Sequence, residues 1–537
     1  MAMVQPEKDP VHDDRLRIIQ AATLVSAAFV VSRILGVVRD AAINFNYDID
    51  SLEANAYFIA NGFPEFIFYI VAGGALGSAF IPTFSAYFVR DDARGGWRLF
   101  SAVLNLIVII ATGIAALAAL FAPQLISLFY PDLIAKDPEL LETSVALMRI
   151  LLLTTIIFGA SGVIMAALNA RQHFLLPAIA PIIYNLGIIA GVVLLAPNIL
   201  GLAVGAVAGA LGHLAIQLPG LRRQNAVYTP VVTVSDPGVR QVLRLMFPRV
   251  LGLSFGQLNH LLIRFLAQSM IIGSIPALGF AWRITIMPLA IIGQALAIAA
   301  FPTFATLAAQ HALDKMRRIL ADTLRLIFFL SLPASILLML LRRPIVSVLF
   351  ERGQFGAEST EFVAWALLFY AMSLVGLAAI EIIARAFYAM EDTWTPVLVG
   401  ALQLIAMWLI GLWLSQSVFP LFDWLELGAL ALGYSISTFL ELGLLLWLLR
   451  RKMGGIDGSR LFAGLWRMLL ATVVMIAITW ITLEQIGNFN VLWQLLIGGL
   501  VGAVSYLIAS IVFGVKEIRQ LANYGRERLA NRRRSGG

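Results

Sequence analysis

Charged side chains interrupt a long apolar run near the start of the chain. The run covers about residues 18–45 and contains Arg33, Arg39 and Asp40. A charged group at bilayer depth is costly, so it normally faces a protein interior or a wet cavity. Helical geometry puts Arg33 and Asp40 on one face, roughly 10 Å apart along the axis, and Arg39 with Ser32 on a flanking face. Snorkelling of Arg39 to the membrane interface is the alternative. The cluster as a whole predicts a polar, cationic cavity.

Polar residues also interrupt three later apolar runs. The candidate lining residues there are Asn55 and Glu65 in the second run, Gln257 and Arg264 in the seventh, and Arg283 and Gln294 in the eighth. The alternative for such residues is hydrogen bonding between helices that only holds the bundle together. Glu381 and Arg385 are four residues apart, so we expect them to form a structural pair within one helix. For His213 with Gln217, and for Glu441, we expect a packing role.

Arginines outnumber acids in this proposed lining. Arginine stays charged in any surroundings and offers planar, bidentate donors that suit phosphate or carboxylate. The set therefore predicts an anionic cargo that carries a phosphate or diphosphate. We expect no cofactor and no metal site, because the loops contain no paired carboxylates and no cluster of metal ligands. An enzyme is accordingly disfavoured.

The composition identifies an integral membrane protein. The chain is 60% hydrophobic and 13% charged, its mean hydropathy is +0.89, and soluble domains carry about 25% charged residues. The absence of cysteine excludes disulfides and thiolate metal sites. The net charge of +7 lies mostly in short loops and the C-terminal tail, which indicates membrane topology rather than nucleic-acid binding.

Apolar stretches of about 18 residues or more can span a membrane as helices. They lie near residues 18–45, 54–88, 99–122, 142–168, 174–196, 199–220, 241–270, 276–308, 317–341, 361–388, 395–416, 427–450, 461–483 and 491–514. We therefore expect an all-α protein with about fourteen transmembrane helices. Basic residues cluster after even-numbered spans, which places both termini in the cytoplasm by the positive-inside rule.

An internal repeat is visible within the sequence. The motif Pro82-Thr83-Phe84 recurs 220 positions later as Pro302-Thr303-Phe304. Two further matches are displaced by 216 positions, from residues 33–36 to 249–252, and by 219 positions, from 167–170 to 386–389. Each half then holds six spans, and two lobes of the same orientation are related by an axis along the membrane normal. Two such lobes that face each other across a central cavity are the plan of a transporter.

These patterns divide the chain into six parts. We expect a cytoplasmic tail at 1–17, a first lobe at 18–220, a cytoplasmic linker at 221–240, a second lobe at 241–450, two additional helices at 461–514, and a basic cytoplasmic tail at 515–537.

The segment Ser32–Asp40 resembles the first-helix signature of the lipid II flippases of peptidoglycan synthesis, the MurJ or MviN family. Further similar stretches are residues 75–82, 252–257, 350–355 and 384–396, so the resemblance covers nearly the whole chain. It implies the fold of the multidrug/oligosaccharidyl-lipid/polysaccharide exporter superfamily, alternating access, and a cationic cavity for the diphosphate and sugars. It also implies that the last two spans form a groove for the polyprenyl tail.

Individual residues match this family unevenly. Arg33, Arg39 and Asp40 match functional positions, and Arg283 matches the essential arginine of the eighth helix. The departures are Phe68 where the family has an arginine, Trp282 and Ile263 where it has acids, Asn55 for another acid, and Glu65 for an asparagine. The loss of the acid at Ile263 argues against sodium coupling.

The leading hypothesis is a monomeric flippase in the bacterial inner membrane that moves a polyprenyl-diphosphate-linked peptidoglycan precursor to the outer leaflet. Its partners would be this anionic lipid and membrane lipid, with cell-wall synthesis proteins as candidate protein partners. One alternative is an ion-coupled exporter of small drugs on the same fold, which needs a buried acid such as Asp40 or Glu65. Another is a membrane scaffold without transport, for which the lost acids and Phe68 argue.

Overall fold

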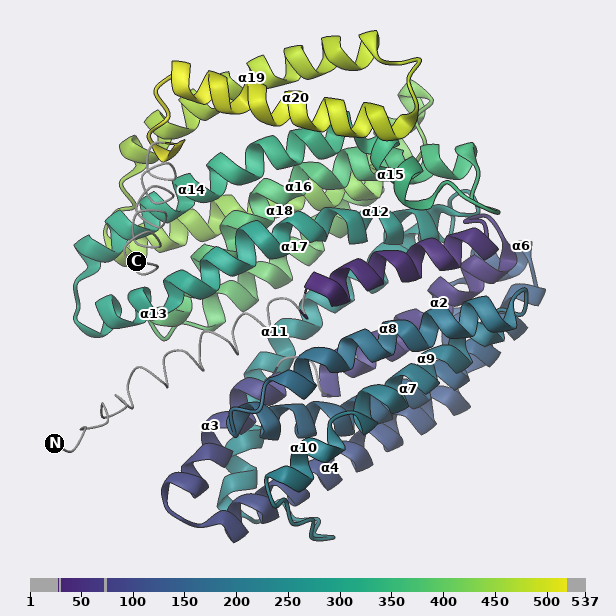
Figure 1. Cartoon of the computed structure of the whole chain (residues 1–537), viewed down its shortest axis with the longest axis vertical. Helices are drawn as coiled ribbons and strands as arrows, with labels where there is room; N and C mark the ends of the chain where they lie inside the picture. The colour runs from purple at the N-terminus through teal and green to yellow at the C-terminus, as the bar shows by residue number, and fades with distance from the viewer. Residues whose placement is uncertain (1–27, 29, 72–74, 519–537) are drawn as a thin grey trace, which may run out of the picture. The chain divides into compact units, whose positions relative to one another are not determined.

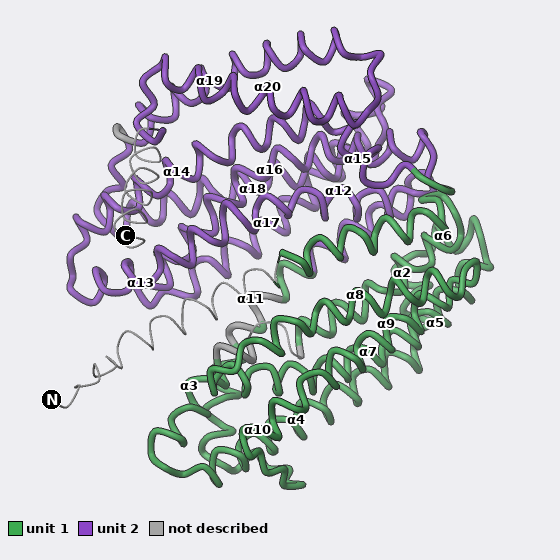
Figure 2. The backbone as a smooth tube through the Cα atoms, in the orientation of Figure 1, with its two compact units in different colours: residues 1–257, 352–354 green, residues 258–351, 355–537 purple. Residues whose placement is uncertain are grey.

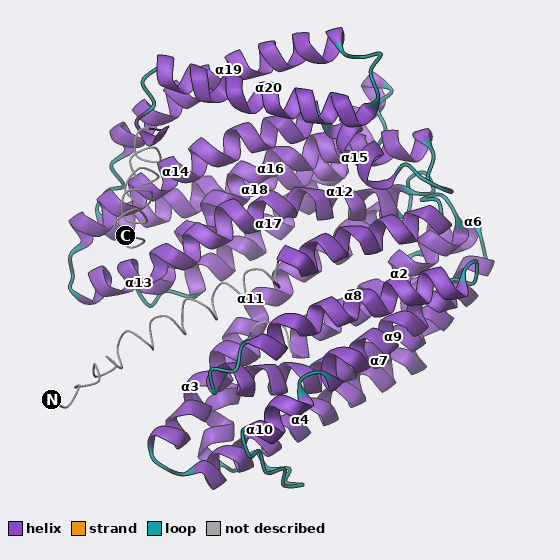
Figure 3. Ribbon diagram, viewed as in Figure 1, coloured by secondary structure: helices purple, strands orange, loops and turns teal. Residues whose placement is uncertain are grey.

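The computed structural model describes residues 28, 30–71 and 75–518 of the chain. Within these residues the secondary structure is entirely helical, as Figure 3 shows. The predicted N-terminal tail at 1–17, the first part of the first span and the basic tail from residue 519 onward lie outside the described residues.

The described residues form two compact units that divide after Gln257 (Figure 2). Residues 352–354 belong to unit 1, where the Gln354 N–H donates to the Phe45 carbonyl at 3.0 Å. The helices of unit 1 are residues 30–46, α2 (Leu52–Val71), α3 (Ala75–Val89), α4 (Ala93–Leu120), α5 (Ala122–Phe129), α6 (Pro131–Lys136), α7 (Glu139–Ala170), α8 (Leu175–Leu195), α9 (Leu200–Ala215), α10 (Leu218–Arg223) and the first part of α11 (Pro237–Ala267).

Unit 2 begins inside α11 rather than at the predicted linker, and the lobe boundaries themselves stay a prediction. Its further helices are α12 (Ser274–Leu289), the π-helix η1 (Ala290–Gln294), α13 (Ala295–Ala309), α14 (Leu313–Leu340), α15 (Arg342–Phe350), α16 (Ala357–Ala389), α17 (Trp394–Trp413), the π-helix η2 (Leu414–Val418), the 3-10 helix η3 (Phe419–Phe422), α18 (Leu427–Met453), α19 (Gly458–Gln485) and α20 (Val491–Val512).

Eleven helical stretches among the described residues are long and apolar enough to cross a membrane. They lie at the predicted positions from 99–122 onward, with the exception of the predicted span 241–270. That segment forms the single helix α11, in which several side chains between residues 248 and 253 lie outside the described part of the chain. The predicted span 54–88 contains two shorter helices, α2 and α3. The structure thus establishes a multi-pass helical protein, and the count of fourteen stays a prediction.

The repeat in the sequence is also visible in the helix bounds. The helices α3 and α13 each have 15 residues and begin 220 positions apart, and α4 and α14 each have 28 residues with the same displacement. Left-handed backbone at non-glycine residues recurs as well. Asp91 and His311 have φ of 57° and 52°, and Gln172 and Glu391 have φ of 57° and 60°. Corresponding loops of the two halves therefore turn in the same way.

One long helix forms the centre of each unit. In unit 1, α7 packs against α2, α3, α4 and α9. In unit 2, the corresponding helix α16 packs against α12, α13, α14 and α18. The hairpin of α19 and α20 lies along α14 in the same unit (Figure 1).

The start of the predicted C-terminal tail belongs to the folded part of unit 2. Val515 and Glu517 are 2% and 3% exposed, so the chain after α20 returns to the protein interior. The cytoplasmic location of the tail from residue 515 stays a prediction. Composition alone did not reveal that residues 515–518 pack against unit 2.

Candidate substrate-binding site

Unit 1 contains a buried charged centre on helix 30–46. The Arg39 guanidinium donates from Nε and Nη2 to Asp40 Oδ1, at 3.0 and 2.8 Å. Their side chains are 19% and 6% exposed. Arg39 also donates from Nη1 to Asn185 Oδ1 on α8 at 3.1 Å. Two oxygens from two helices therefore orient this guanidinium, which still has two of its five N–H groups without a hydrogen bond to any described residue.

The amide of Asn185 holds this centre in place. Its Nδ2 donates to the Ser32 carbonyl at 3.4 Å and to the Pro181 carbonyl at 3.1 Å. The predicted site residue Ser32 thus takes part through its backbone. Tyr57 and Tyr184 lie close enough to Arg39 to act on it electrostatically. The centre combines an oriented arginine with hydroxyl groups, which suits a phosphate.

The structure pairs Asp40 with Arg39, its neighbour in sequence. The placement of Arg33 and Asp40 on one face of the cavity stays a prediction. The side chain of Arg33 is exposed, and Arg33 and Glu65 both act electrostatically on Tyr69 of α2. The structure therefore brings Arg33 and Glu65 to the same tyrosine.

Asn55 makes backbone contacts at the start of α2. It is 2% exposed, and its Nδ2 donates to the carbonyls of Ile49 and Ser51, both at 2.9 Å. These bonds secure the turn before the helix. Binding of a substrate by Asn55 stays a prediction, and its amide donors are engaged with the backbone.

Phe68, in place of the family arginine, belongs to an aromatic core in unit 1. Its ring lies 5.6 Å from that of Phe158 on α7, which contacts Tyr184 and His213 at 4.9 and 5.1 Å. His213 in turn shares a buried hydrogen-bond network with Ser161 and Gln217. The packing role that we predicted for His213 and Gln217 is confirmed.

Unit 2 places Arg264 beside a cluster of aromatic rings. Arg264 acts electrostatically on Tyr370 of α16. Trp282 of α12 contacts Tyr370, Tyr434 and His260, with ring centroids 5.6, 5.1 and 4.8 Å apart. The tryptophan that replaces a family acid is therefore packed by aromatic neighbours.

The remaining predicted site residues of α11 to α13 are half-buried. Arg283 lies over the Phe280 ring at 5.5 Å from its centroid. Gln294 is the last residue of the π-helix η1, and π-helical turns inside α-helices are frequent at functional sites. Gln257 is half-buried on α11, at the end of unit 1. Binding roles for Arg283, Gln294 and Gln257 stay predictions.

The second acid–arginine pair is local, as predicted. Glu381 and Arg385 form an ion pair of 2.6 Å within α16. Glu441, which we also treated as structural, is half-buried on α18 and acts electrostatically on Tyr434. No group of three or more acidic or histidine side chains with metal-binding geometry occurs in the described part of the chain.

Sequence reasoning missed several buried polar partners. Asn185 was not singled out, nor was the chain in which Asn259 donates to Gln403 at 2.7 Å and Gln403 donates to Ser437 at 2.9 Å. These neutral residues lie far apart in sequence. Arg325, by contrast, is a charge inside the predicted span 317–341 and carried the same signal as Arg33.

The family model described as "Lipid II flippase MurJ" matches residues 50–523. This chain belongs to the MurJ family. The resemblance inferred from the sequence is thereby confirmed, and the family consists of transporters rather than enzymes. Curated relatives agree. The chain is similar to a probable lipid II flippase MurJ of Vibrio cholerae, with 30% identity over 80% of this chain and 82% of the relative. Another, from Buchnera aphidicola, is 28% identical over 92% of this chain and 96% of the relative.

Solved structures show which known folds this chain resembles. A lipid II flippase MurJ in an inward closed conformation matches with a TM-score of 0.75 and 23% identity, over 91% of this chain and 98% of that one. An inward-facing multidrug transporter of the MATE family matches with a TM-score of 0.64 and 14% identity, over 79% of this chain and 99% of that one. The expected exporter fold is therefore present.

Proposed function

We propose that this protein moves lipid II, a polyprenyl-diphosphate-linked precursor, from the inner to the outer leaflet of the bacterial cytoplasmic membrane by alternating access. The observation that carries the proposal is the MurJ family match over residues 50–523. Eleven stretches long and apolar enough to span a membrane support it, as do the half-buried arginines Arg39, Arg264 and Arg283. We further propose fourteen spans with both termini in the cytoplasm and a monomeric protein.

Arg39, Arg264 and Arg283 would bind the lipid diphosphate. Arg39 is held by Asp40 and Asn185 and keeps two N–H donors for a ligand, so part of its ordering cost is met before binding. Hydrogen bonds to an ionised oxygen are about twice as strong as neutral ones. Arg33 and Asp40 would adjust the local charge as the substrate enters and leaves.

The α19–α20 hairpin would hold the lipid tail. A cavity of about 560 Å³ lies on this hairpin and is lined by apolar residues such as Val474, Ile478, Val504 and Ile508. Its lining suits an isoprenoid chain, because apolar side chains can pack against the tail by van der Waals contact and leave no polar group unsatisfied in the membrane. The family resemblance implied a tail groove at the same two helices.

Export of the diphosphate needs no separate ion site for its energy. Each negative charge that leaves an inside-negative cell releases about 2.3 kcal/mol per 100 mV. Ile263, at the position of a family acid, is 4% exposed and packs as a core residue. This supports movement driven by the membrane potential.

Binding in detergent tests the assignment of the diphosphate site. The variants are R264Q, R283Q and the double variant R39Q/D40N, which removes both charges of the buried pair together. We expect affinity for lipid II to fall by about tenfold or more in each, since a hydrogen bond to a charged group contributes about 1.5–3 kcal/mol. Affinity for a polyprenol without diphosphate should not change.

Arg343 provides the matched control. It forms an ion pair with Glu361 on an exposed surface of unit 2, so R343Q should bind lipid II like the wild type. Equal losses in R343Q and R283Q would show a general charge effect and contradict the proposed site.

A further inference from the structure

A buried ion pair fastens the end of the α19–α20 hairpin to α14. Arg325 Nη2 and Glu517 Oε1 are 2.6 Å apart, with side chains that are 9% and 4% exposed. Arg325 lies about 18 Å along α14 from its first residue, Leu313. Glu517 follows α20, so the pair joins the chain after the hairpin to a helix of the central bundle of unit 2.

The helix α19 meets the same point. A side chain at Gly464 would collide with Arg325, since its Cβ would lie 2.7 Å from Nε. Arg467 of α19 donates from Nη1 to the Gly514 carbonyl at 3.0 Å. The N-terminal part of α19, the end of α20 and α14 are thus joined at one place.

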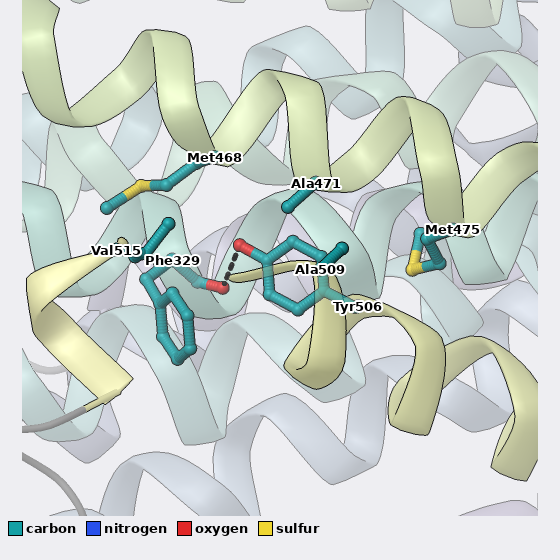
Figure 4. Close-up of a cluster of buried hydrophobic side chains, with 7 residues drawn as sticks. All are labelled: Phe329, Met468, Ala471, Met475, Tyr506, Ala509 and Val515. Carbon is teal, nitrogen blue, oxygen red and sulfur yellow. Dashed lines mark hydrogen bonds between the residues drawn. The ribbon is translucent and has the colours of Figure 1, made fainter. Parts of the chain in front are cut away.

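The middle of the hairpin packs on the next turn of α14. The Tyr506 hydroxyl of α20 donates to the Phe329 carbonyl at 3.0 Å, as Figure 4 shows. The buried side chains around it are Phe329, Met468, Ala471, Met475, Tyr506, Ala509 and Val515. A displacement of Glu517 would therefore also move Val515 and Ala509, because these residues lie close to Glu517 in the sequence.

The apolar cavity shares residues with this cluster. Ala509 belongs to both, and Val474, another lining residue, packs against the cluster. The lining comes from α19 and α20, so the spacing of these two helices sets the width of the cavity.

The position in unit 1 that corresponds to Arg325 also binds a segment outside the helices, the linker before α11. Asn105 of α4 lies 220 positions before Arg325. It donates from Nδ2 to the Val231 carbonyl at 2.9 Å and accepts from the Tyr228 hydroxyl at 2.9 Å. In unit 1 this position is neutral and binds the linker before α11. Unit 2 has a buried charge pair there, which requires both partners at once.

We propose that Arg325 and Glu517 are positioning residues that hold the α19–α20 cavity at the width that accepts a polyprenyl tail. The inference rests on the proposed function, because it assigns the cavity to the lipid tail. Loss of the pair frees the end of α20, widens the range of helix spacings and weakens the selection of long tails over short ones.

Transport in vesicles tests this selectivity. The variants are R325M/E517Q, which removes both charges, and R325E/E517R, which restores a pair with reversed charges. We expect exchange of lipid II with its full-length tail to fall by roughly tenfold in R325M/E517Q, which is less than the ~100-fold loss that a 1 Å misplacement of a bound group can cause. Exchange of a farnesyl analogue should stay at the wild-type rate, and the reversed pair should restore part of the difference.

The control is E381Q/R385M, which removes the other arginine–glutamate pair of unit 2 within α16. An unchanged ratio of long-tail to short-tail exchange in R325M/E517Q would overturn the proposal. Exchange of neither lipid by the wild type would instead contradict the proposed function.

A distance measurement keeps the test independent of transport. The chain contains no cysteine, so spin labels at V473C on α19 and I511C on α20, both exposed positions, report this spacing alone. We expect one narrow distance distribution with the ion pair present and a broader one in R325M/E517Q. Equal widths would show that the pair does not position the hairpin.

Discussion

The two units join corresponding helices by different chemistry. In unit 1, Arg39 connects helix 30–46 to Asn185 of α8, and α8 meets α9 through glycine backbone. In unit 2, a chain of neutral side chains from Asn259 through Gln403 to Ser437 connects α11, α17 and α18. The helices α8 and α17 begin 219 positions apart, so these are equivalent joints of the repeat.

The glycine contacts in unit 1 are tight along much of α8 and α9. A Cβ on Gly205 would lie 2.6 Å from the Gly187 carbonyl oxygen, and a Cβ on Gly209 would lie 2.6 Å from the Tyr184 carbonyl oxygen. In unit 2 a comparable approach occurs between α18 and α17, where a Cβ on Gly433 would lie 2.9 Å from Gly411 Cα. The close approach of the two backbones fixes the position of α8, which carries Asn185 of the charged centre.

This difference shows how a duplicated fold can separate its tasks. A neutral amide chain holds helices together without burying charge, whereas a buried charge pair carries a desolvation cost that a functional role can offset. We therefore interpret the unit 1 joint as a part of the binding machinery and the unit 2 joint as a structural connection.

The largest predicted effect concerns the charged joint. R39L leaves the buried Asp40 carboxylate without its arginine, and removal of one partner of a buried pair costs about 3–5 kcal/mol. The double variant R39L/D40N should recover much of this loss, because no charge remains. Thermal unfolding of the purified protein in detergent measures both. A single variant as stable as the double variant would contradict a buried pair.

The neutral joint should respond less strongly. Q403L leaves the Asn259 amide group without its acceptor, in a residue whose Oδ1 already has no partner among the described residues. An unsatisfied buried donor costs about 1–3 kcal/mol. N259L/Q403L should be less destabilised than Q403L, which double-mutant analysis of thermal midpoints detects. Additive losses would mean that the two side chains act independently.

The glycine contacts predict effects of opposite sign in the two units. G205A places a methyl group against the backbone of α8 and should destabilise the protein by about 1–3 kcal/mol, as overpacking does. Gly400 of α17 has no atom within 4 Å of its would-be Cβ, so G400A should stabilise its helix by about 0.5–1 kcal/mol. Thermal unfolding midpoints of G205A and G400A measure the two effects. Equal shifts in both variants would contradict the difference in packing between α8 and α17.

The smallest predicted effect lies in the loop after α16. Asp392 binds Lys452 at 2.6 Å and Thr395 through two hydrogen bonds. Burial alone would raise the pKa of Asp392, but the bonds from Lys452 and Thr395 outweigh it and hold the pKa below its ordinary value of 3.8. The stabilisation is therefore present above pH 3.8 and is lost as the pH falls through the lowered pKa.

At neutral pH, D392N should lower stability by about 0.2–1 kcal/mol, the range of partly exposed pairs. The difference from the wild type should shrink as the pH falls below 3.8, and K452M should show the same profile. A difference that stays constant with pH would exclude the ionised pair as its cause. The equivalent loop of unit 1 uses Arg171, stacked on Phe88 and bonded to Gln224, and offers no such carboxylate.

The sequence predicted what depends on local runs of residues. Apolar length located eleven helical stretches from 99–122 onward. The displaced motifs predicted an internal repeat, which the structure shows in the equal lengths of α3 with α13 and of α4 with α14. The charges at Arg39 and Asp40 were also found, but not their pairing, because neighbouring residues on a helix do not normally face each other.

Partners distant in sequence could not be read from composition. Gln403 lies 144 residues from Asn259, and neither breaks an apolar pattern strongly. Glu517 was assigned to a tail because basic residues follow it, whereas its partner Arg325 is supplied by α14. The roles of such residues depend on tertiary contacts. The sequence indicates such a role only where a charged residue interrupts an apolar run.

Leaflet exchange of labelled lipid II in vesicles tests the central claim most directly. The wild type, R283A and the control R343Q would be compared with and without an imposed membrane potential. The account predicts exchange by the wild type and R343Q that the potential accelerates, and none by R283A in a folded preparation. Full exchange by R283A, or no exchange by a folded wild type, would contradict it.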